Sequence, residues 1–331
     1  MSARDHIRAL PKAELHLHIE GTLEPDLAFR LARRNGVELP WADEAALAKA
    51  MDFSDLQSFL DVYYQAMAAL RTPADFADLM DAYLTRARAD GVRHAEIFFD
   101  PQVHIGNGVA FDDVVDGLLE GWRSHTDVSG GLIMCFLRDR GPEAAADLLA
   151  AARHRAGDLI GVGLDSAEVG NPPEPFADVF AQARGLGLRA VAHAGEEGGP
   201  EYVWGALRAL GAERIDHGIR VLEDDALVGE LVARQVPLTV CPLSNVRLKA
   251  VAGHAAHPFP ELLARGLKVT VNSDDPAYFG GYLAANFECL DDAFGLQPQT
   301  LATLCRNSIE ASFAAPERQA ELLAELGAAA Q

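Results

Sequence analysis

Eight short runs of apolar and β-branched residues recur along the chain, and stretches with helical spacing lie between most of them. The runs are apolar at consecutive positions, which is typical of strands buried on both faces of a parallel sheet. They span residues 14–21, 94–101, 131–139, 159–168, 188–196, 214–220, 237–245 and 268–276. Strands that alternate with helices pair in parallel through right-handed crossovers, so eight units predict an α/β fold, the (β/α)8 or TIM barrel.

The helical stretches are rich in Ala, Leu and Arg, and they include residues 112–123, 142–155, 175–186 and 224–234. One gap is much longer than the rest, because residues 22–93 separate the first two predicted strands and contain helical stretches at 27–35 and 56–70. We expect a helical insertion at the catalytic mouth, which is either a lid or a plain pair of scaffold helices. The Ala-rich tail after Pro298 is predicted to form helices on the barrel exterior.

The composition agrees with one barrel domain that spans residues 1–331. A length of 331 residues is ordinary for an α/β barrel, and a hydrophobic content of 49% suffices for a large core. The four cysteines are widely spaced and form no C-x-x-C pair, so we expect reduced thiols that serve packing in a cytoplasmic protein. They are Cys135, Cys241, Cys289 and Cys305.

The charge balance limits the classes of partner. A net charge of −21 argues against nucleic acid and against anionic membrane surfaces, both of which require basic patches. The chain starts MSARDHIRALPK and contains no unbroken apolar run of 18 residues, so we expect neither a signal peptide nor a membrane span. The expected partner is a small molecule, and assembly into a homo-oligomer is left open by the sequence.

Polar residues suited to metal chemistry end several of the predicted strands. His16 and His18 lie two positions apart, so in a strand both imidazoles project to one face, here the barrel interior. An H-x-H pair alone is a weak signal, but the turn residues that follow Glu20 place this pair at the mouth of the barrel. The carboxyl ends of parallel barrel strands meet at that mouth, so ligands distant in sequence converge there.

Three further clusters end the fifth, sixth and eighth predicted strands. His193 and Glu196 lie in HAGEEGG, and His217 lies in IDHG. Asp274 and Asp275 lie in NSDDP, where adjacent carboxylates repel one another unless a cation or a shared proton is present. A set of imidazoles and carboxylates without thiolates suits zinc or another late first-row ion.

Six motifs together resemble the adenosine/adenine deaminase family of the amidohydrolase superfamily. They are HLHIEGTLEP, LDSAEVGNPP, HAGEEG, IDHG, CPLSN and VNSDDPAYFG, and they extend from Leu10 to about Asn307. The resemblance implies one zinc ion with four ligands, which are His16, His18, His193 and Asp274. It also implies roles for Glu196 as proton donor to a purine ring, His217 as the catalytic histidine and Asp275 as a contact to the imidazole edge of the purine.

The chemistry of hydrolytic deamination agrees with these implied roles. A zinc-bound water has its pKa lowered toward about 7, so hydroxide is available to attack the amino-bearing ring carbon. Glu196 must be protonated when the substrate binds, which demands a pKa raised by a dry pocket. Binuclear relatives in the superfamily commonly use a modified lysine on the fourth strand, and LDSAE offers none, so one metal ion is favoured over two.

The substrate is predicted from differences within the family. Adenosine deaminases typically carry Asp in H-x-H-L-D-G, whereas this chain has Glu20, whose longer side chain would reach into the space that a ribose needs. The adenine deaminase branch is therefore favoured, with adenosine and N6-modified or extended adenines as alternatives. Ser166, Glu168 or Glu20 are candidates to line the ribose-free side of the base, while Ser244 and Asn245 of CPLSN are expected to give structural support.

Two expectations concern the residues that the mechanism leaves out. A metal-binding barrel without turnover, serving as a scaffold or sensor, should lack the proton donor or base, but Glu196 and His217 are both present. The other histidines are expected on the surface or in packing roles, with His104 the candidate to face the mouth. They are His6, His104, His125, His154, His254 and His257.

Overall fold

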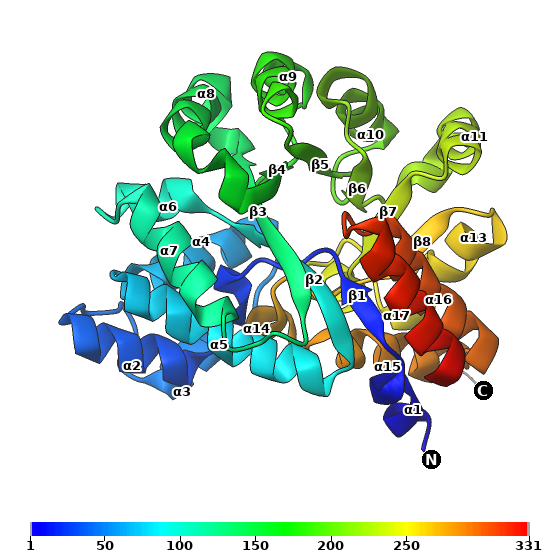
Figure 1. Ribbon diagram of the computed structural model, residues 1–331, viewed down its shortest axis with the longest axis horizontal. Coiled ribbons are helices and arrows are strands. Elements are labelled where there is room, and N and C mark those ends of the chain that lie inside the picture. Colours follow the sequence, from blue (N-terminus) through cyan, green and yellow to red (C-terminus); the bar gives the residue numbers. More distant parts are fainter. Residues whose placement is uncertain (1, 330–331) are drawn as a thin grey trace.

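Eight parallel strands form a barrel with helices around its outside in the computed structural model, which describes residues 2–329 (Figure 1). The strands pair in sequence order, from first to eighth. They are β1 (Lys12–Glu14), β2 (Val92–Phe99), β3 (Ser129–Leu137), β4 (Leu159–Asp165), β5 (Arg189–Ala194), β6 (Arg214–His217), β7 (Pro237–Val240) and β8 (Lys268–Val271). The predicted TIM barrel is confirmed.

The seam between the first and last strands is closed by residues just beyond them. The His18 amide donates to the Asp274 carbonyl at 3.0 Å, and the Asp274 amide donates to the His16 carbonyl at 3.1 Å. Nearer to β1, the Leu15 amide donates to the Asn272 side-chain oxygen at 2.9 Å, so a side chain takes the place of a backbone partner. The predicted strand at 14–21 was therefore wrong in its bounds, because regular pairing ends at Glu14.

Other strands also end earlier than predicted, and proline explains the ends of β2 and β7. Short helices with proline at their first position begin two residues after β2 and β7, and another begins five residues after β8. They are α6 (Pro101–Gly106), α12 (Pro242–Arg247) and α14 (Pro276–Phe279). Proline has no N–H to donate to a strand ladder, and its fixed φ suits the first turn of a helix.

Helices cover the barrel where helical spacing was predicted. They are α7 (Phe111–Trp122), α8 (Gly141–Ala152), α9 (Ala177–Gly185) and α11 (Asp225–Arg234), together with α10 (Pro200–Gly205), α13 (Phe259–Ala264) and α15 (Leu283–Phe294). The predicted insertion contains α2 (Pro25–Asn35), α3 (Glu44–Ala50), α4 (Leu56–Ala66) and α5 (Pro73–Ala89). Helix α5 packs against α7 on the outside, whereas α4 contributes side chains to the pocket at the mouth. The insertion therefore contains one helix that packs on the barrel exterior, α5, and one that covers the pocket, α4.

The C-terminal helices lie on the barrel exterior, as predicted. Helix α16 (Pro298–Ala311) packs against β1 and β8, and α17 (Pro316–Ala329) packs against α16 (Figure 1). The chain between these two helices reaches the end of the barrel opposite the mouth, here called the lower end. There the centre of the Phe313 ring lies 4.6 Å from the Arg214 guanidinium carbon. Arg214 donates to Glu96 Oε2 at 2.6 Å, and both side chains are buried. A buried ion pair thus closes the end opposite the mouth.

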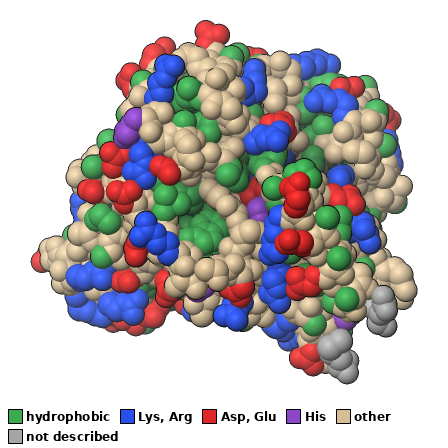
Figure 2. Space-filling model, viewed as in Figure 1, with side chains coloured by type: hydrophobic (Ala, Val, Ile, Leu, Met, Phe, Trp, Pro, Cys, Tyr) green, Lys and Arg blue, Asp and Glu red, His purple; other side chains and the backbone are tan. Residues whose placement is uncertain are grey.

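The surface carries both acidic and basic side chains, which are interspersed over the face that Figure 2 shows. Among residues 2–329, no helix is long and apolar enough to cross a membrane. All four cysteines are free thiols, and Cys289 alone among them is partly exposed.

Candidate metal centre and active site

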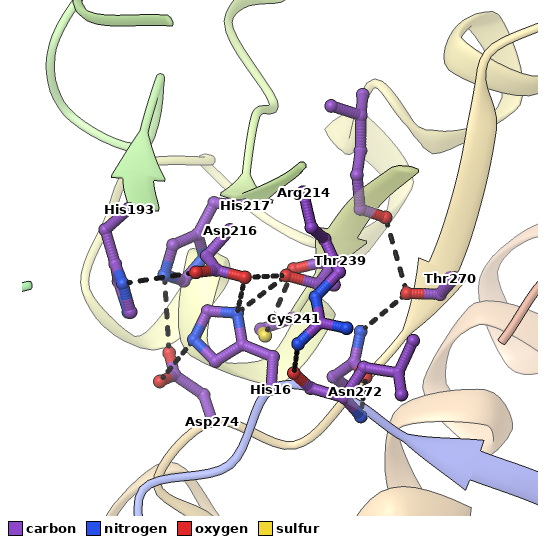
Figure 3. A network of polar contacts seen from close by, with 12 residues as sticks. His16, His193, Arg214, Asp216, His217, Thr239, Cys241, Thr270, Asn272 and Asp274 are labelled. Carbon is purple, nitrogen blue, oxygen red and sulfur yellow. Dashed lines mark hydrogen bonds and ion pairs between the residues drawn. The ribbon is translucent and has the colours of Figure 1, made fainter. Parts of the chain in front are cut away.

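The seven residues predicted for the site come together at the carboxyl ends of the strands. They are His16 and His18 after β1, His193 in β5, Glu196 after β5, His217 at the end of β6, and Asp274 and Asp275 after β8. All seven side chains are buried, and Figure 3 shows four of them pointing toward one another. His217 and Asp274 have φ angles of 65° and 64°, in the left-handed region that few residues other than glycine adopt. Such backbone strain is typical of functional sites.

Donor atoms of the predicted ligands lie close together at the mouth of the barrel. His16 Nε2 lies 3.2 Å from Asp274 Oδ1, and His18 Nε2 lies 3.2 Å from His193 Nε2. The distance from His18 Nε2 to Asp274 Oδ1 is 3.6 Å, and tetrahedral zinc ligands with bonds of about 2.0–2.1 Å lie about 3.3–3.4 Å apart. Among the described residues, the four donors that all lie within 4.8 Å of one another come from His16, His193, His217 and Asp274, so His217 joins this group in place of the predicted His18.

Hydrogen bonds behind His16 leave its inner nitrogen free as a ligand. The Asp216 carboxylate only accepts, so the single Thr239 hydroxyl proton is donated to it at 2.8 Å. Thr239 Oγ1 then accepts from His16 Nδ1 at 3.0 Å (Figure 3). The proton of the neutral ring is thereby held on Nδ1, and the Nε2 lone pair faces Asp274, where it has no hydrogen-bond partner.

Carboxylates also lie behind the other two imidazoles. Asp216 Oδ2 is 3.8 Å from His193 Nδ1, and Asp165 Oδ2 is 3.7 Å from His18 Nδ1. Burial lowers the pKa of His18 to about 4 and the pKa of His193 well below its usual value. Metal ions bind neutral imidazole, so both rings are ready to bind one near pH 7.

A chain of hydrogen bonds fixes the orientation of His217. The Phe259 amide donates to His257 Nδ1 at 3.0 Å, so the neutral His257 ring carries its proton on Nε2 and donates to Asn245 Oδ1 at 3.1 Å. The Asn245 amide then donates to His217 Nδ1 at 3.2 Å. His217 is left with its proton on Nε2, which lies 3.5 Å from Glu196 Oε2.

Glu196 is held in a dry environment by Glu168. The Glu168 carboxylate accepts four consecutive amides, from Gly195 at 2.7 Å, Glu196 at 3.1 Å, and Glu197 and Gly198 at 2.8 Å. Burial raises the pKa of the Glu196 carboxyl well above its usual value, and the nearby carboxylates add to this shift. Glu168 therefore supports the loop that carries Glu196. It does not line the pocket, so the prediction that named it as a candidate for the ribose-free side of the base was wrong for this residue.

A small cavity of about 40 Å³ lies beside these residues, and side chains of α4 cover it. Its apolar walls exclude water, which agrees with the raised pKa of Glu196. They include Leu56, Phe59, Leu60, Tyr63, Leu248 and Phe279. Six of the seven site residues, all but His16, also line the pocket, and its other polar groups are Tyr64, Asp100, Asp165 and Ser166.

The candidates for the ribose-free side of the base differ in position. Ser166 lines the pocket and bonds to the Tyr64 hydroxyl at 3.0 Å. Glu20 does not line it, because Glu20 Oε1 accepts from the Asp100 amide at 3.0 Å and bonds to His104 Nε2 at 2.7 Å. The predicted reach of Glu20 into ribose space was wrong, since its carboxylate is turned toward β2 and α6. His104 is likewise buried behind the pocket.

Several functional positions were not predicted from the sequence. Asp216 and Thr239 orient His16, and His257 acts through Asn245 on His217. The expected supporting role of Asn245 agrees with its contact. Asp216 could have been noticed as a charged residue within an apolar run of the sequence. No local signal distinguished the buried His257 from the exposed His154.

Comparisons with known proteins identify the family of the chain and agree with its fold. A family model described as adenosine deaminase matches residues 11–329. An adenine deaminase of Streptomyces coelicolor is 59% identical over 329 residues, which cover 98% of this chain and 97% of that protein. The crystal structure of an adenine deaminase from Arthrobacter aurescens has a TM-score of 0.95 and 54% identity, and the match covers 97% of this chain and 99% of that one.

A more distant structure is an amidohydrolase from Burkholderia ambifaria with bound Zn. It has a TM-score of 0.89 and 27% sequence identity, and the match covers 100% of this chain and 94% of that one.

Proposed function

The chain belongs to the adenosine deaminase family and is a purine deaminase, and on that premise we propose that it converts adenine to hypoxanthine and ammonia at a single zinc ion. The convergence of four buried donors beside a neutral glutamic acid carries this proposal. The adenine deaminases of Streptomyces coelicolor and Arthrobacter aurescens support the choice of base.

The residues that would hold the zinc ion are His16, His18, His193 and Asp274. Three neutral imidazoles and one carboxylate suit zinc in charge and in donor type. When bound, zinc supplies a water of lowered pKa and polarises it for attack at neutral pH. The Thr239 and Asp216 pair would keep His16 in the tautomer that this ligand set requires.

Glu196 supplies the proton that the reaction needs at the ring. When the water oxygen bonds to C6 of adenine, the electron pair of the C6–N1 double bond moves to N1. A protonated Glu196 donates to N1 at that moment and thus traps the tetrahedral intermediate. The C6–amino bond then breaks. The amino group leaves as ammonia with one proton of the water, and the C6 hydroxyl becomes the carbonyl of hypoxanthine as its remaining proton returns to Glu196.

His217 and Asp275 orient the reactants. The hydrogen-bond chain from Phe259 leaves His217 with an Nε2 proton, so His217 acts as a donor that holds the attacking water toward C6. Burial and the adjoining Asp274 raise the pKa of Asp275 well above its usual value, so its carboxyl donates to N7 of the base. Gly21 makes room for that carboxyl, because a Cβ there would lie 2.2 Å from Asp275 Oδ1.

The first test is ammonia release by the zinc-loaded enzyme, with adenine and adenosine compared at equal concentration. We expect a strong preference for adenine, and a preference for adenosine would overturn the proposed substrate. His16→Ala should lose zinc and activity together, as measured by metal analysis of the purified protein. His154→Gln, at an exposed histidine, is the matched control and should keep both.

A second variant separates proton donation from metal binding. Glu196→Gln keeps the shape of the side chain but offers no acidic proton, so we expect zinc at the wild-type ratio and a loss of kcat of about 10²–10⁴-fold. Wild-type turnover in this variant would rule out the role of Glu196.

A further inference from the structure

Two buried carboxylates face the centre from the opposite side of the barrel mouth. Asp100 follows β2 and Asp165 ends β4. In a ring of eight strands in sequence order, β2 and β4 lie across from β6 and β8, which carry His217 and Asp274. Asp100 and Asp165 therefore line the part of the pocket that lies farthest around the ring from those two residues.

Asp100 is fixed by hydrogen bonds at its amide and at Oδ2, but its Oδ1 atom has no hydrogen-bond partner. Its amide donates to Glu20 Oε1 at 3.0 Å, and the Tyr63 hydroxyl from α4 donates to Oδ2 at 3.5 Å. The side chain is 2% exposed, yet Oδ1 has no hydrogen-bond partner. A buried acceptor without a donor is costly, so this oxygen is suited to a donor that arrives with the substrate.

Asp165, like Asp100, has an Oδ1 atom without a hydrogen-bond partner. Its other oxygen, Oδ2, lies 3.7 Å from His18 Nδ1. One oxygen from each of the two aspartates lies within 4.8 Å of the other and of a His18 nitrogen. Buried carboxylates this close favour a proton donor or a cation between them.

Free adenine offers a donor that its nucleoside lacks. With C6 at the metal centre, N1 at Glu196 and N7 at Asp275, the N3–N9 edge of the base faces the opposite side of the mouth. N9 carries a hydrogen in the free base and a sugar in adenosine. Building on the proposed function, we propose that Asp100 accepts a hydrogen bond from N9–H and thereby selects the free base over the nucleoside.

The same contact disfavours a substituted base. A group on N9 removes the donor and points at Asp100 and at Tyr63 of α4, which are both buried. The nucleoside would then leave a buried acceptor oxygen without a donor, and a site built to bind an N–H group strongly rejects analogues that lack it. Glu20 contributes indirectly, because it holds the Asp100 backbone.

The test compares kcat/KM for adenine and for 9-methyladenine, which differs at N9 alone. We expect the wild type to prefer adenine strongly, and Asp100→Ala to lower kcat/KM for adenine about 10–100-fold while the value for 9-methyladenine stays constant or rises. Asp100→Asn keeps the volume of the side chain and should also shrink the ratio. Asp139→Asn, at an exposed aspartate after β3, is the control and should keep the wild-type ratio.

Each other outcome has a distinct meaning. If both substrates lose activity equally in both Asp100 variants, Asp100 is only structural and the proposal is overturned. If the wild type binds two zinc ions per chain and Asp100→Ala binds one, the two aspartates hold a cation, which also overturns it. A wild type that is inactive on adenine would refute the proposed function itself, and this proposal with it.

Discussion

Two of the imidazoles in the site, His16 and His217, are hydrogen-bonded to the protein at Nδ1. His16 is fixed by the Thr239 hydroxyl, whose own proton is held by Asp216, and His217 is fixed by Asn245. In both cases the chain of donors ends on a group that cannot reverse its role, a carboxylate in one and the Phe259 amide in the other. Protein contacts alone therefore define the tautomers that the chemistry needs.

Glu168 provides the residue-scale prediction. In Glu168→Gln, an amide –NH2 replaces one acceptor oxygen and faces amides that also donate, so the loop that carries Glu196 should shift. We expect kcat to fall about 10–100-fold. Zinc content should stay at the wild-type ratio and unfolding should remain cooperative, because the metal ligands are untouched. The measurements are steady-state kinetics and metal analysis of the same preparation.

Glu168→Asp is the companion variant for this prediction. It keeps both acceptor oxygens on a shorter stem, so it should recover part of the lost kcat. Equal activity in Glu168→Gln and the wild type would show that the four hydrogen bonds do not position Glu196.

The residues predicted from the sequence were those at the ends of strands, where residue type and position both carry information. His16, His193 and Asp274 were found because strand periodicity and barrel topology bring such ends together. His257 was not found, because it lies in a loop and acts only through Asn245. Its partners are set by tertiary packing, which no local pattern records.

The elements were predicted better than their bounds. All eight strands exist where apolar runs occur, but the runs continue into helices such as α14 and cannot show where backbone pairing stops. Within the insertion, α4 covers the pocket and α5 packs against α7 on the outside, while the choice between a lid and a plain scaffold stays a prediction.

Helix α4 provides the element-scale prediction. The Asp55 carboxylate caps α4 by accepting from the Ser58 amide at 2.8 Å, and removal of such a cap costs about 1 kcal/mol. Asp55→Ala should therefore loosen the first turn of α4, which covers the pocket. We expect KM for adenine to rise about two- to tenfold, with little change in kcat. Hydrogen exchange should quicken at the amides of the first turns of α4.

Asp43→Ala is the matched control for this experiment. Asp43 caps α3 in the same way, with the Ala46 amide at 2.8 Å, but α3 does not line the pocket. An equal rise of KM in both variants would contradict a specific role for α4.

For the whole molecule, the buried pair at the lower end of the barrel ties distant segments together. Arg214 donates to Glu96 Oε2 at 2.6 Å, to the Leu15 carbonyl at 3.1 Å and to the Ala311 carbonyl at 3.4 Å. Arg214→Ala would leave the buried Glu96 carboxylate without its guanidinium partner, with only His94 and the Phe313 amide bonded to it, so we expect a loss of about 3–5 kcal/mol in the free energy of unfolding. Chemical denaturation measures this change, and Tm should fall by roughly 10 °C.

The double variant Arg214→Met, Glu96→Leu distinguishes the ion pair from packing. Replacement of both charges by apolar groups of similar size should recover most of the stability. If the single and double variants are equally unstable, packing rather than the unpaired charge explains the loss.

The closure of the barrel between its first and last strands has a consequence for biosynthesis. The donor atoms at the centre come from His16 and His18 at one end of the chain and from Asp274 near the other. At roughly 5–20 residues per second, a ribosome needs about 13–50 s to pass from the second of these histidines to the aspartate. Throughout that time the nascent chain has no complete set of ligands, so capture of the metal ion belongs to the last stage of maturation.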